Sequence, residues 1–391
     1  MTNTQDVPNI QTGKDFLGEH YNLSFNPLTP DPCTKIKEYV ERTDELKRFE
    51  RDINLGTKKF CSYLVIGEKG LGKTSFVNIC MKKAQNYGLK TIYIPNVPNS
   101  GQKFIQDLLA ATLKTAEEFM DVPGGKTYSE YIHKKSVHPK TVFEKWTELI
   151  DQMQPKPVIV AIDETDNLPG ISQIAPLFNN YIFDQAKNII FFLCTLPGTY
   201  KEMHENMGAF TDRFPLVMDI TPFSKEELML CLEKKLSSAR IDKKNMKSLY
   251  HPFDMDAINV LLEYANGVPR YMLEIAGEAI QESLNNKDVM INKGMIVAAA
   301  NNVQRSTLDK AWLHLTYMEK ETLVKMIELG GEGLKLVELA DALNKTKGTI
   351  VPYLNKLDAC GLIERGGKKP ADIIYKVIAD AESIKRLSGG R

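Results

Sequence analysis

The chain has 391 residues, of which 43% are hydrophobic and 26% are charged. This is the usual balance of a globular protein, and it excludes a wholly disordered or collagen-like chain. The 50 basic and 50 acidic residues cancel, so no overall charge field marks a polyanion-binding protein. The six cysteines follow no metal-ligand or disulfide spacing, and no apolar run approaches the ~20 residues that span a bilayer. We therefore expect a soluble, cytoplasmic protein of two or three domains, with no signal peptide and no membrane contact.

Composition and periodicity divide the chain into four parts. Residues 1–35 are polar and rich in Pro and Asn, which predicts an extended N-terminal arm open to a protein partner. Residues 36–222 alternate apolar runs with helical stretches, which is typical of parallel strands joined by crossover helices. Residues 223–316 show only helical periodicity, and residues 317–391 predict short helices followed by a hairpin. The five predicted strands are 62–66, 91–95, 158–162, 189–195 and 216–220.

A glycine-rich turn follows the first predicted strand and precedes a helix. It matches G-x-x-x-x-G-K-[ST] at every fixed position, and this is the context that a phosphate-binding loop requires. Glycines let backbone N–H groups turn towards phosphate, and the helix N-terminus adds partial positive charge. Lys73 is expected to reach the β- and γ-phosphates, and the Thr74 hydroxyl to bind Mg²⁺. The predicted nucleotide contacts are Gly67, Glu68, Lys69, Gly70, Leu71, Gly72, Lys73, Thr74 and Ser75.

The third predicted strand ends in two carboxylates, Asp163 and Glu164. Open α/β sheets bind ligands at the carboxyl ends of their strands, so we expect both acids beside the phosphate loop. Asp163 is predicted to hold Mg²⁺ through water, and Glu164 to polarise the attacking water as a general base. The sequence lacks the Asn-Lys-x-Asp motif that reads guanine, which favours ATP over GTP.

Further segments in chain order resemble the AAA+ ATPases of the origin-recognition group and their STAND relatives, over residues ~36–310. Tyr39–Leu46 is similar to the family segment that packs near the adenine, with Glu41 in place of its central glycine. The resemblance implies a base contact for Val40 in this segment. Thr195 ends the fourth predicted strand, where the family has its sensor 1 residue, and a hydroxyl there can contact the γ-phosphate or the lytic water.

Two arginines extend the resemblance. Arg213, just before the fifth predicted strand, is similar to the arginine finger that reaches the ATP of a neighbouring subunit. Arg270 starts a helix after Gly267-Val268-Pro269 and is similar to the sensor 2 residue of the AAA+ lid. The family thus implies self-association with ATP at subunit interfaces. A strand-end threonine, a surface arginine and an ordinary Pro-initiated helix remain the structural alternatives for Thr195, Arg213 and Arg270.

The last part of the chain has the element order of a winged helix. Two helical stretches lead into a strand, a Gly/Lys/Pro turn and a second strand, and residues 349–365 resemble the second helix and first wing strand of such domains. Between residues 344 and 369, six basic residues stand against two acidic ones, a local net charge of +4. Duplex DNA is the expected ligand, and protein docking is the alternative. The predicted DNA contacts are Lys347, Thr349, Tyr353, Lys356, Lys368 and Lys369.

Together these features predict a P-loop NTPase of the AAA+ type, with a parallel five-stranded α/β domain, a helical lid and a C-terminal winged helix. We expect a Mg²⁺-dependent ATPase that binds double-stranded DNA as an ATP-controlled assembly, of the kind used in replication, mobile elements or defence. The alternative is a STAND-type switch, in which nucleotide gates assembly and the winged helix contacts protein. The helical lid and the winged helix disfavour a metabolic P-loop kinase.

Overall fold

The computed structural model describes residues 10–40, 42–54, 61–118, 121–122, 125–134, 137–153, 157–182, 189–243, 248–366, 374–378 and 381–388. The chain divides into two compact units, Met1–Lys293 and Gly294–Arg391. The sequence predicts a boundary after residue 316, one helix later. The division falls earlier because Leu308 and Trp312 of helix α13 (Lys293–His314) are buried in the core of the second unit.

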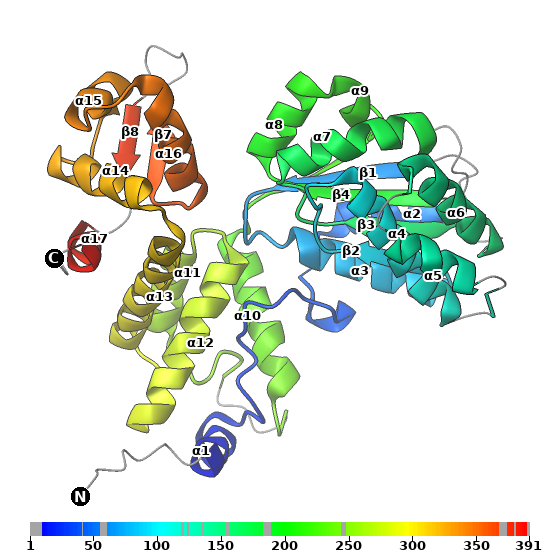
Figure 1. Cartoon of the computed structure of the whole chain (residues 1–391). Coiled ribbons are helices and arrows are strands. Elements are labelled where there is room, and N and C mark those ends of the chain that lie inside the picture. The colour runs from blue at the N-terminus through cyan, green and yellow to red at the C-terminus, as the bar shows by residue number, and fades with distance from the viewer. Residues whose placement is uncertain are drawn as a thin grey trace, which may run out of the picture. The chain divides into compact units, whose positions relative to one another are not determined.

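Five parallel strands form the central sheet of the first unit, in the order β2-β3-β4-β1-β5 (Figure 1). All five predicted strands are confirmed, the last three with the predicted bounds. β3 and β4 are buried along their whole length, as expected of inner parallel strands between two helical layers. The strands are β1 (Cys61–Gly67), β2 (Lys90–Ile94), β3 (Val158–Ile162), β4 (Ile189–Thr195) and β5 (Leu216–Ile220).

Helices cover both faces of this sheet. Side chains alternate along a strand, and in β3 Val158, Val160 and Ile162 lie in one hydrophobic core while Ile159 and Ala161 lie in the other. This packing on two sides fixes the carboxyl ends of the strands, where the candidate site residues lie. The first core is completed by α4 (Gly101–Glu117), α6 (Pro139–Gln152) and α7 (Leu168–Leu177), the second by α2 (Thr43–Asn54) and α3 (Lys73–Asn86).

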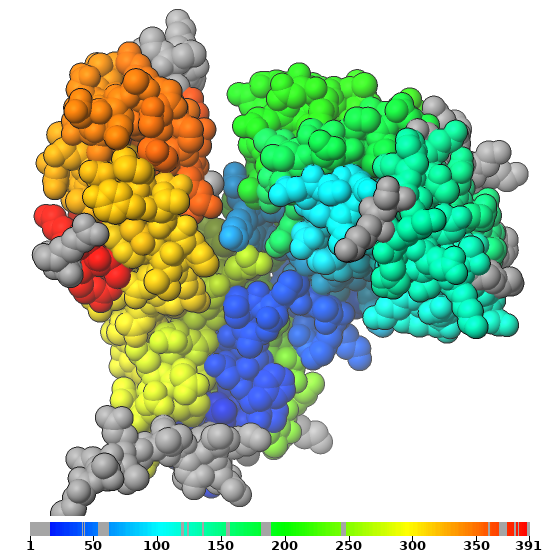
Figure 2. Space-filling model, viewed as in Figure 1, coloured from blue at the N-terminus to red at the C-terminus, as the bar shows by residue number. Residues whose placement is uncertain are grey.

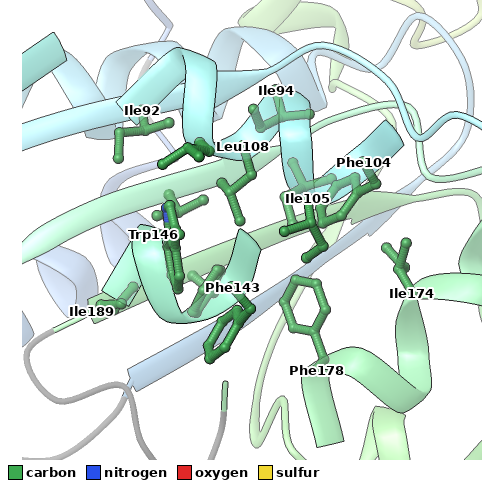
Figure 3. Packing of buried hydrophobic residues seen from close by; sticks show 14 of the residues in the cluster. Ile92, Ile94, Phe104, Ile105, Leu108, Phe143, Trp146, Ile174, Phe178 and Ile189 are labelled. Atoms are coloured by element: carbon green, nitrogen blue, oxygen red, sulfur yellow. The ribbon is translucent and has the colours of Figure 1, made fainter. Parts of the chain in front are cut away.

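Aromatic and aliphatic side chains together fill the first core (Figure 3). Trp146 is fully buried and donates its indole N–H to Thr112 Oγ1 at 2.9 Å, so its polar atom is satisfied. Phe178 meets Phe191 of β4 edge-on, with ring centroids 5.4 Å apart. Each fully buried large side chain contributes about 1.5–3 kcal/mol. The remaining elements of this layer are α5 (Gly125–His133), the π-helical turn η2 (Phe178–Ile182), α8 (Pro197–Asn206) and α9 (Gly208–Thr211).

Three helices follow the sheet within residues 223–316, the predicted lid, and they are called the lid helices below. α10 begins with a capping box in which the Ser224 hydroxyl accepts the Glu227 N–H and the Glu227 carboxylate accepts the Ser224 N–H. Asn266 ends α11 in the left-handed region, at φ 43°, and Pro269 starts the next helix. This short turn directs the N-terminus of α12 towards the phosphate loop. The lid helices are α10 (Lys225–Ala239), α11 (Met255–Ala265) and α12 (Pro269–Asn286).

The prediction of an extended N-terminal arm is wrong for part of that segment, because α1 (Ile10–Tyr21) is a helix. The segment that follows α1 lies on the lid helices, as the blue and yellow surfaces in Figure 2 show. Tyr21 is fully buried, and its hydroxyl donates to Ser283 Oγ at 2.7 Å. The carbonyl of Leu28 occupies the space that a Cβ on Gly277 of α12 would need.

The prediction was wrong because it used the average composition of the segment, which is polar. The few apolar side chains of the segment are nevertheless buried. Leu17, Leu23 and Leu28 are each at most 6% exposed. The chain also hydrogen-bonds the backbone here, for example from Ser24 N–H to the Ala239 carbonyl at 2.9 Å. The described part of the arm is therefore an integral part of the first unit. A short 3-10 turn, η1 (Ile36–Glu38), leads from it into α2.

In the second unit the helices α14, α15 and α16 combine with a small antiparallel sheet, whose strand order is β6-β8-β7, and this is the predicted winged-helix arrangement. Pro352 lies inside α16. Among the described residues, no helix is both long enough and apolar enough to span a bilayer. The elements after α13 are α14 (Tyr317–Glu328), β6 (Leu334–Lys335), α15 (Leu336–Ala342), α16 (Lys347–Ala359), β7 (Ile363–Gly366), β8 (Ile374–Val377) and α17 (Ala381–Ser388).

Candidate nucleotide-binding site

The phosphate loop joins β1 to the N-terminus of α3. Gly70 and Gly72 have φ values of 85° and 98°, a region that side chains with a Cβ rarely adopt. Gly67 is required for a different reason, because a Cβ there would lie 2.7 Å from the carbonyl oxygen of Ile220 on β5. The sequence therefore folds into a tight turn whose backbone leads into a helix N-terminus, which is the geometry that binds phosphate.

Lys73 bends back over this loop. Its ammonium donates to the Gly67 carbonyl at 2.7 Å and to the Glu68 carbonyl at 3.2 Å. Burial lowers the pKa of Lys73, opposed by the charge of Asp166. A phosphate group between the loop and the ammonium would replace these carbonyl contacts with a stronger charge-assisted pair.

Asp163 lies directly after β3 and is 2% exposed. Its Oδ2 accepts the hydroxyl of Thr74 at 2.6 Å, so the two residues predicted to hold Mg²⁺ are in contact. Its Oδ1 accepts the backbone N–H of Glu164 at 2.9 Å. A hydroxyl and a carboxylate at the mouth of a phosphate loop are the oxygen ligands that Mg²⁺ prefers, so these residues fit the ion.

Glu164 follows in a left-handed conformation, with φ 45°, and its side chain is exposed. A non-glycine residue in this region is strained and needs support from its surroundings. Thr165 supplies it, because its N–H and its hydroxyl both donate to the Cys194 carbonyl of β4, at 3.1 and 2.7 Å. The turn that carries the candidate general base is thus fastened to the neighbouring strand.

Thr195 is the last residue of β4. It pairs with Ile66 of β1, and Ile66 directly precedes the phosphate loop. It is fully buried, and its hydroxyl has no hydrogen-bond partner among the described residues. A buried unsatisfied hydroxyl costs about 1–3 kcal/mol, so this atom needs an explanation. A ligand oxygen or a water at the end of the strand would satisfy it, which is the place expected for a residue that senses the γ-phosphate.

The start of α12 lies against the phosphate loop. The backbone N–H of Arg270 donates to the Gly70 carbonyl at 3.4 Å, and a Cβ on Gly70 would lie 2.9 Å from Val268 Cγ1. Only a glycine leaves room for this approach. The positive end of the α12 dipole and the Arg270 side chain are therefore positioned beside the place where phosphates would bind.

Arg213 lies just before β5, at the amino-terminal end of the strands, whereas the phosphate loop follows the carboxyl end of β1. Its carbonyl accepts the hydroxyl of Ser62, and its side chain is exposed. Ser62 precedes Gly67 by five residues along β1, about 16 Å at the rise of a strand. The structure therefore separates Arg213 from the phosphate loop of its own chain.

Val40 lies just before α2 and is buried. The preceding carbonyl, of Tyr39, accepts the ammonium of Lys234 from α10 at 2.6 Å. The guanidinium of Arg42 stacks on Phe223, 4.9 Å from the ring centroid. This segment thus borders both the sheet and the lid, while Glu41 lies outside the described residues.

Three contacts of the site were missed from the sequence. Tyr93, on β2, donates its hydroxyl to Asp163 Oδ2 at 2.9 Å, and burial raises the pKa of Tyr93. Asp166 Oδ1 accepts the N–H of Leu196, which ties the turn after β3 to the end of β4. Ser75 Oγ accepts the N–H of Cys33 at 2.9 Å, so the N-terminal segment reaches the first turn of α3. A polar residue at a strand end was the available signal for Tyr93, and the other two contacts depend on tertiary packing.

The predicted DNA contacts lie on α16 in the second unit. Lys347, Thr349 and Lys356 are exposed, and Tyr353 is half-buried. Thr346 caps the helix by accepting the Thr349 N–H at 3.3 Å. Lys368 and Lys369 lie outside the described residues.

Comparisons with known proteins agree with this architecture. No protein-family model matches the chain. An uncharacterised HTH-type transcriptional regulator of Methanocaldococcus jannaschii is 24% identical over 388 residues, covering 93% of this chain and 92% of that protein.

Solved structures of similar fold include three from the origin-recognition proteins. The Aeropyrum pernix ORC1 protein in complex with DNA has a TM-score of 0.65 at 16% identity, covering 93% of this chain and 96% of that one. The Aeropyrum pernix ORC2 protein in ADPNP–ADP complexes gives 0.56 at 12% identity, with 88% and 91% covered. Drosophila ORC bound to DNA gives 0.51 at 14% identity, with 99% and 95% covered. The chain therefore has the P-loop AAA+ fold of the origin-recognition proteins, and the resemblance seen in the sequence is confirmed at the level of the fold.

Proposed function

We propose that the protein is an ATPase that binds and hydrolyses Mg²⁺–ATP at the phosphate loop and acts on double-stranded DNA through its winged helix. The observation that carries the proposal is the direct contact of Thr74 with Asp163, beside a loop whose glycines and lysine are set for phosphate. Hydrolysis at such a site requires positioning and charge neutralisation rather than a covalent intermediate.

Each residue of the site has a separate task in this proposal. Lys73 binds the β- and γ-phosphates, and Arg270 neutralises charge from the lid side. Glu164 accepts a proton from the attacking water, and Thr195 orients that water or the γ-phosphate. Mg²⁺, held by Thr74 and Asp163, would neutralise phosphate charge.

Arg213 supports an assembly in which ATP lies between subunits. The residue is exposed and is separated from its own phosphate loop by the length of β1, so any nucleotide that its guanidinium contacts would be bound to a neighbouring chain. An arginine that reaches the transferred phosphate from a partner accelerates hydrolysis strongly in other NTPases. We infer a head-to-tail arrangement of subunits.

DNA binding is supported by the second unit and by the comparisons. α16 exposes Lys347, Thr349 and Lys356 within a segment of net charge +4. The relative in Methanocaldococcus jannaschii is named an HTH-type regulator, and the ORC1 structure is a DNA complex. If the winged helix contacts protein instead, the chain is a nucleotide switch, and DNA leaves its hydrolysis rate unchanged.

Steady-state ATP hydrolysis of Glu164→Gln tests the catalytic part. Loss of a general base costs about 10²–10⁴-fold in rate, so we expect at least a hundredfold fall in kcat with unchanged nucleotide affinity. Glu202→Gln is the matched control, because Glu202 is an exposed carboxylate of α8 that has no assigned part in the site. Equal rates for wild type and Glu164→Gln would show that Glu164 is not the base.

A further inference from the structure

Tyr93 contacts the centre of the candidate site from β2, a strand that carries none of the predicted site residues. It pairs with Ala161 across β2 and β3, two residues before Asp163. Its hydroxyl donates to Asp163 Oδ2 at 2.9 Å, and Thr74 donates to the same oxygen at 2.6 Å. One carboxylate oxygen thus receives two hydroxyl donors from two different elements.

The other oxygen of Asp163 is held by the backbone. Oδ1 accepts the N–H of Glu164 at 2.9 Å, and this donor lies on the strained turn after β3. The Thr74 hydroxyl is the group expected to use its oxygen for Mg²⁺. Tyr93 is then a side-chain donor, beside the Cys194 thiol, that restrains the plane of the carboxylate while Thr74 serves the ion.

The ring of Tyr93 makes this restraint rigid. It packs against the hydrophobic core formed by α2, α3 and one face of the sheet. A phenol has only two side-chain torsions before its hydroxyl, so a packed ring fixes the donor in space.

We propose that Tyr93 is a positioning residue, which orients the Asp163 carboxylate for Mg²⁺ and thereby sets the affinity of the site for the metal–nucleotide complex. The inference rests on the proposed nucleotide site. Groups that orient a metal ligand typically contribute 10–100-fold to metal affinity, which gives the expected size of the effect.

Tyr93→Phe removes the hydroxyl and keeps the ring. A fluorescent, non-hydrolysable ATP analogue is titrated into the full chain in EDTA and then at increasing Mg²⁺. We expect unchanged affinity in EDTA and about a tenfold rise in the Mg²⁺ concentration that gives half of the metal-dependent gain in affinity. Tyr63→Phe is the matched control on β1, because its hydroxyl bonds Asp52 outside the site, and its Mg²⁺ dependence should be that of the wild type.

A double-mutant cycle separates positioning from a general loss of packing. In an Asp163→Asn background, Tyr93→Phe should leave the Mg²⁺ dependence unchanged, because the hydroxyl acts through the carboxylate. The inference is overturned if Tyr93→Phe has the Mg²⁺ dependence of the wild type, or if its affinity falls equally in EDTA and in Mg²⁺. If the wild type does not bind the analogue at all, the proposed nucleotide site is itself wrong. This outcome is distinct from the two results for Tyr93→Phe that overturn the inference.

Discussion

One hydrogen bond, from Thr74 to Asp163, joins the two halves of the candidate site. The residues belong to α3 and to the end of β3, and they are 89 positions apart in the chain. The loop glycines allow this close approach, because a Cβ on Gly67 or Gly70 would clash with neighbouring atoms, and the buried strand β3 carries Asp163 at its end. At the scale of residues, this contact brings together the hydroxyl and the carboxylate that are expected to hold Mg²⁺.

Thr195→Val separates function from stability. The Thr195 hydroxyl is buried without a partner among the described residues, so replacing it with a methyl group of similar size removes an unsatisfied polar atom. We expect the thermal unfolding midpoint to stay the same or rise, while ATP hydrolysis falls at least tenfold. A lowered midpoint with full activity would contradict the role given to Thr195.

At the scale of elements, the N-terminal segment ties the lid to α3. Tyr21 and Leu28 lie on α12, and Cys33 bonds Ser75 of the first turn after the phosphate loop. A segment of about a dozen residues thus connects the lid with the phosphate-binding helix. Movement of the lid therefore requires this segment to move or its contacts to break.

Gly277→Ala tests how tightly the segment is seated. Alanine favours a helix over glycine by up to about 1 kcal/mol, but here its Cβ would meet the Leu28 carbonyl. Overpacking against backbone costs about 1–3 kcal/mol, so we expect the midpoint of thermal unfolding to fall. Gly198→Ala in α8 is the control, since nothing lies within 4 Å of its Cβ, and its midpoint should hold or rise. A higher midpoint for Gly277→Ala would contradict the close packing of the Leu28 carbonyl on α12.

The sequence predicts elements better than it predicts the contacts between them. The strands were predictable because continuous apolar runs, such as 158–162, are unambiguous when they alternate with helices. The phosphate loop was predictable because its chemistry is local. α1 was not, because its helix depends on the lid surface on which Tyr21 is buried. Tyr93 and Asp166 were missed for the same reason, since strand order decides which side chains meet.

At the scale of the whole molecule, the position of Arg213 predicts activity shared between chains. Arg213→Ala keeps an intact phosphate loop, and Lys73→Ala keeps an intact arginine, so each should be nearly inactive alone. Mixed in equal amounts, they should recover part of the wild-type hydrolysis, because one chain supplies the nucleotide site and the other the guanidinium. A mixture with no more activity than its components would place Arg213 outside the reaction.

The most direct test of the account is the rate of ATP hydrolysis measured with and without duplex DNA, for wild type and for Lys347→Glu/Lys356→Glu. Lys385→Glu is the control, because Lys385 is an exposed lysine of the same unit on α17. We expect DNA to raise the wild-type and control rates, with the effect declining as salt increases, and to leave the double variant unstimulated at its normal basal rate. A wild-type rate that does not change with DNA at any salt concentration would contradict the account.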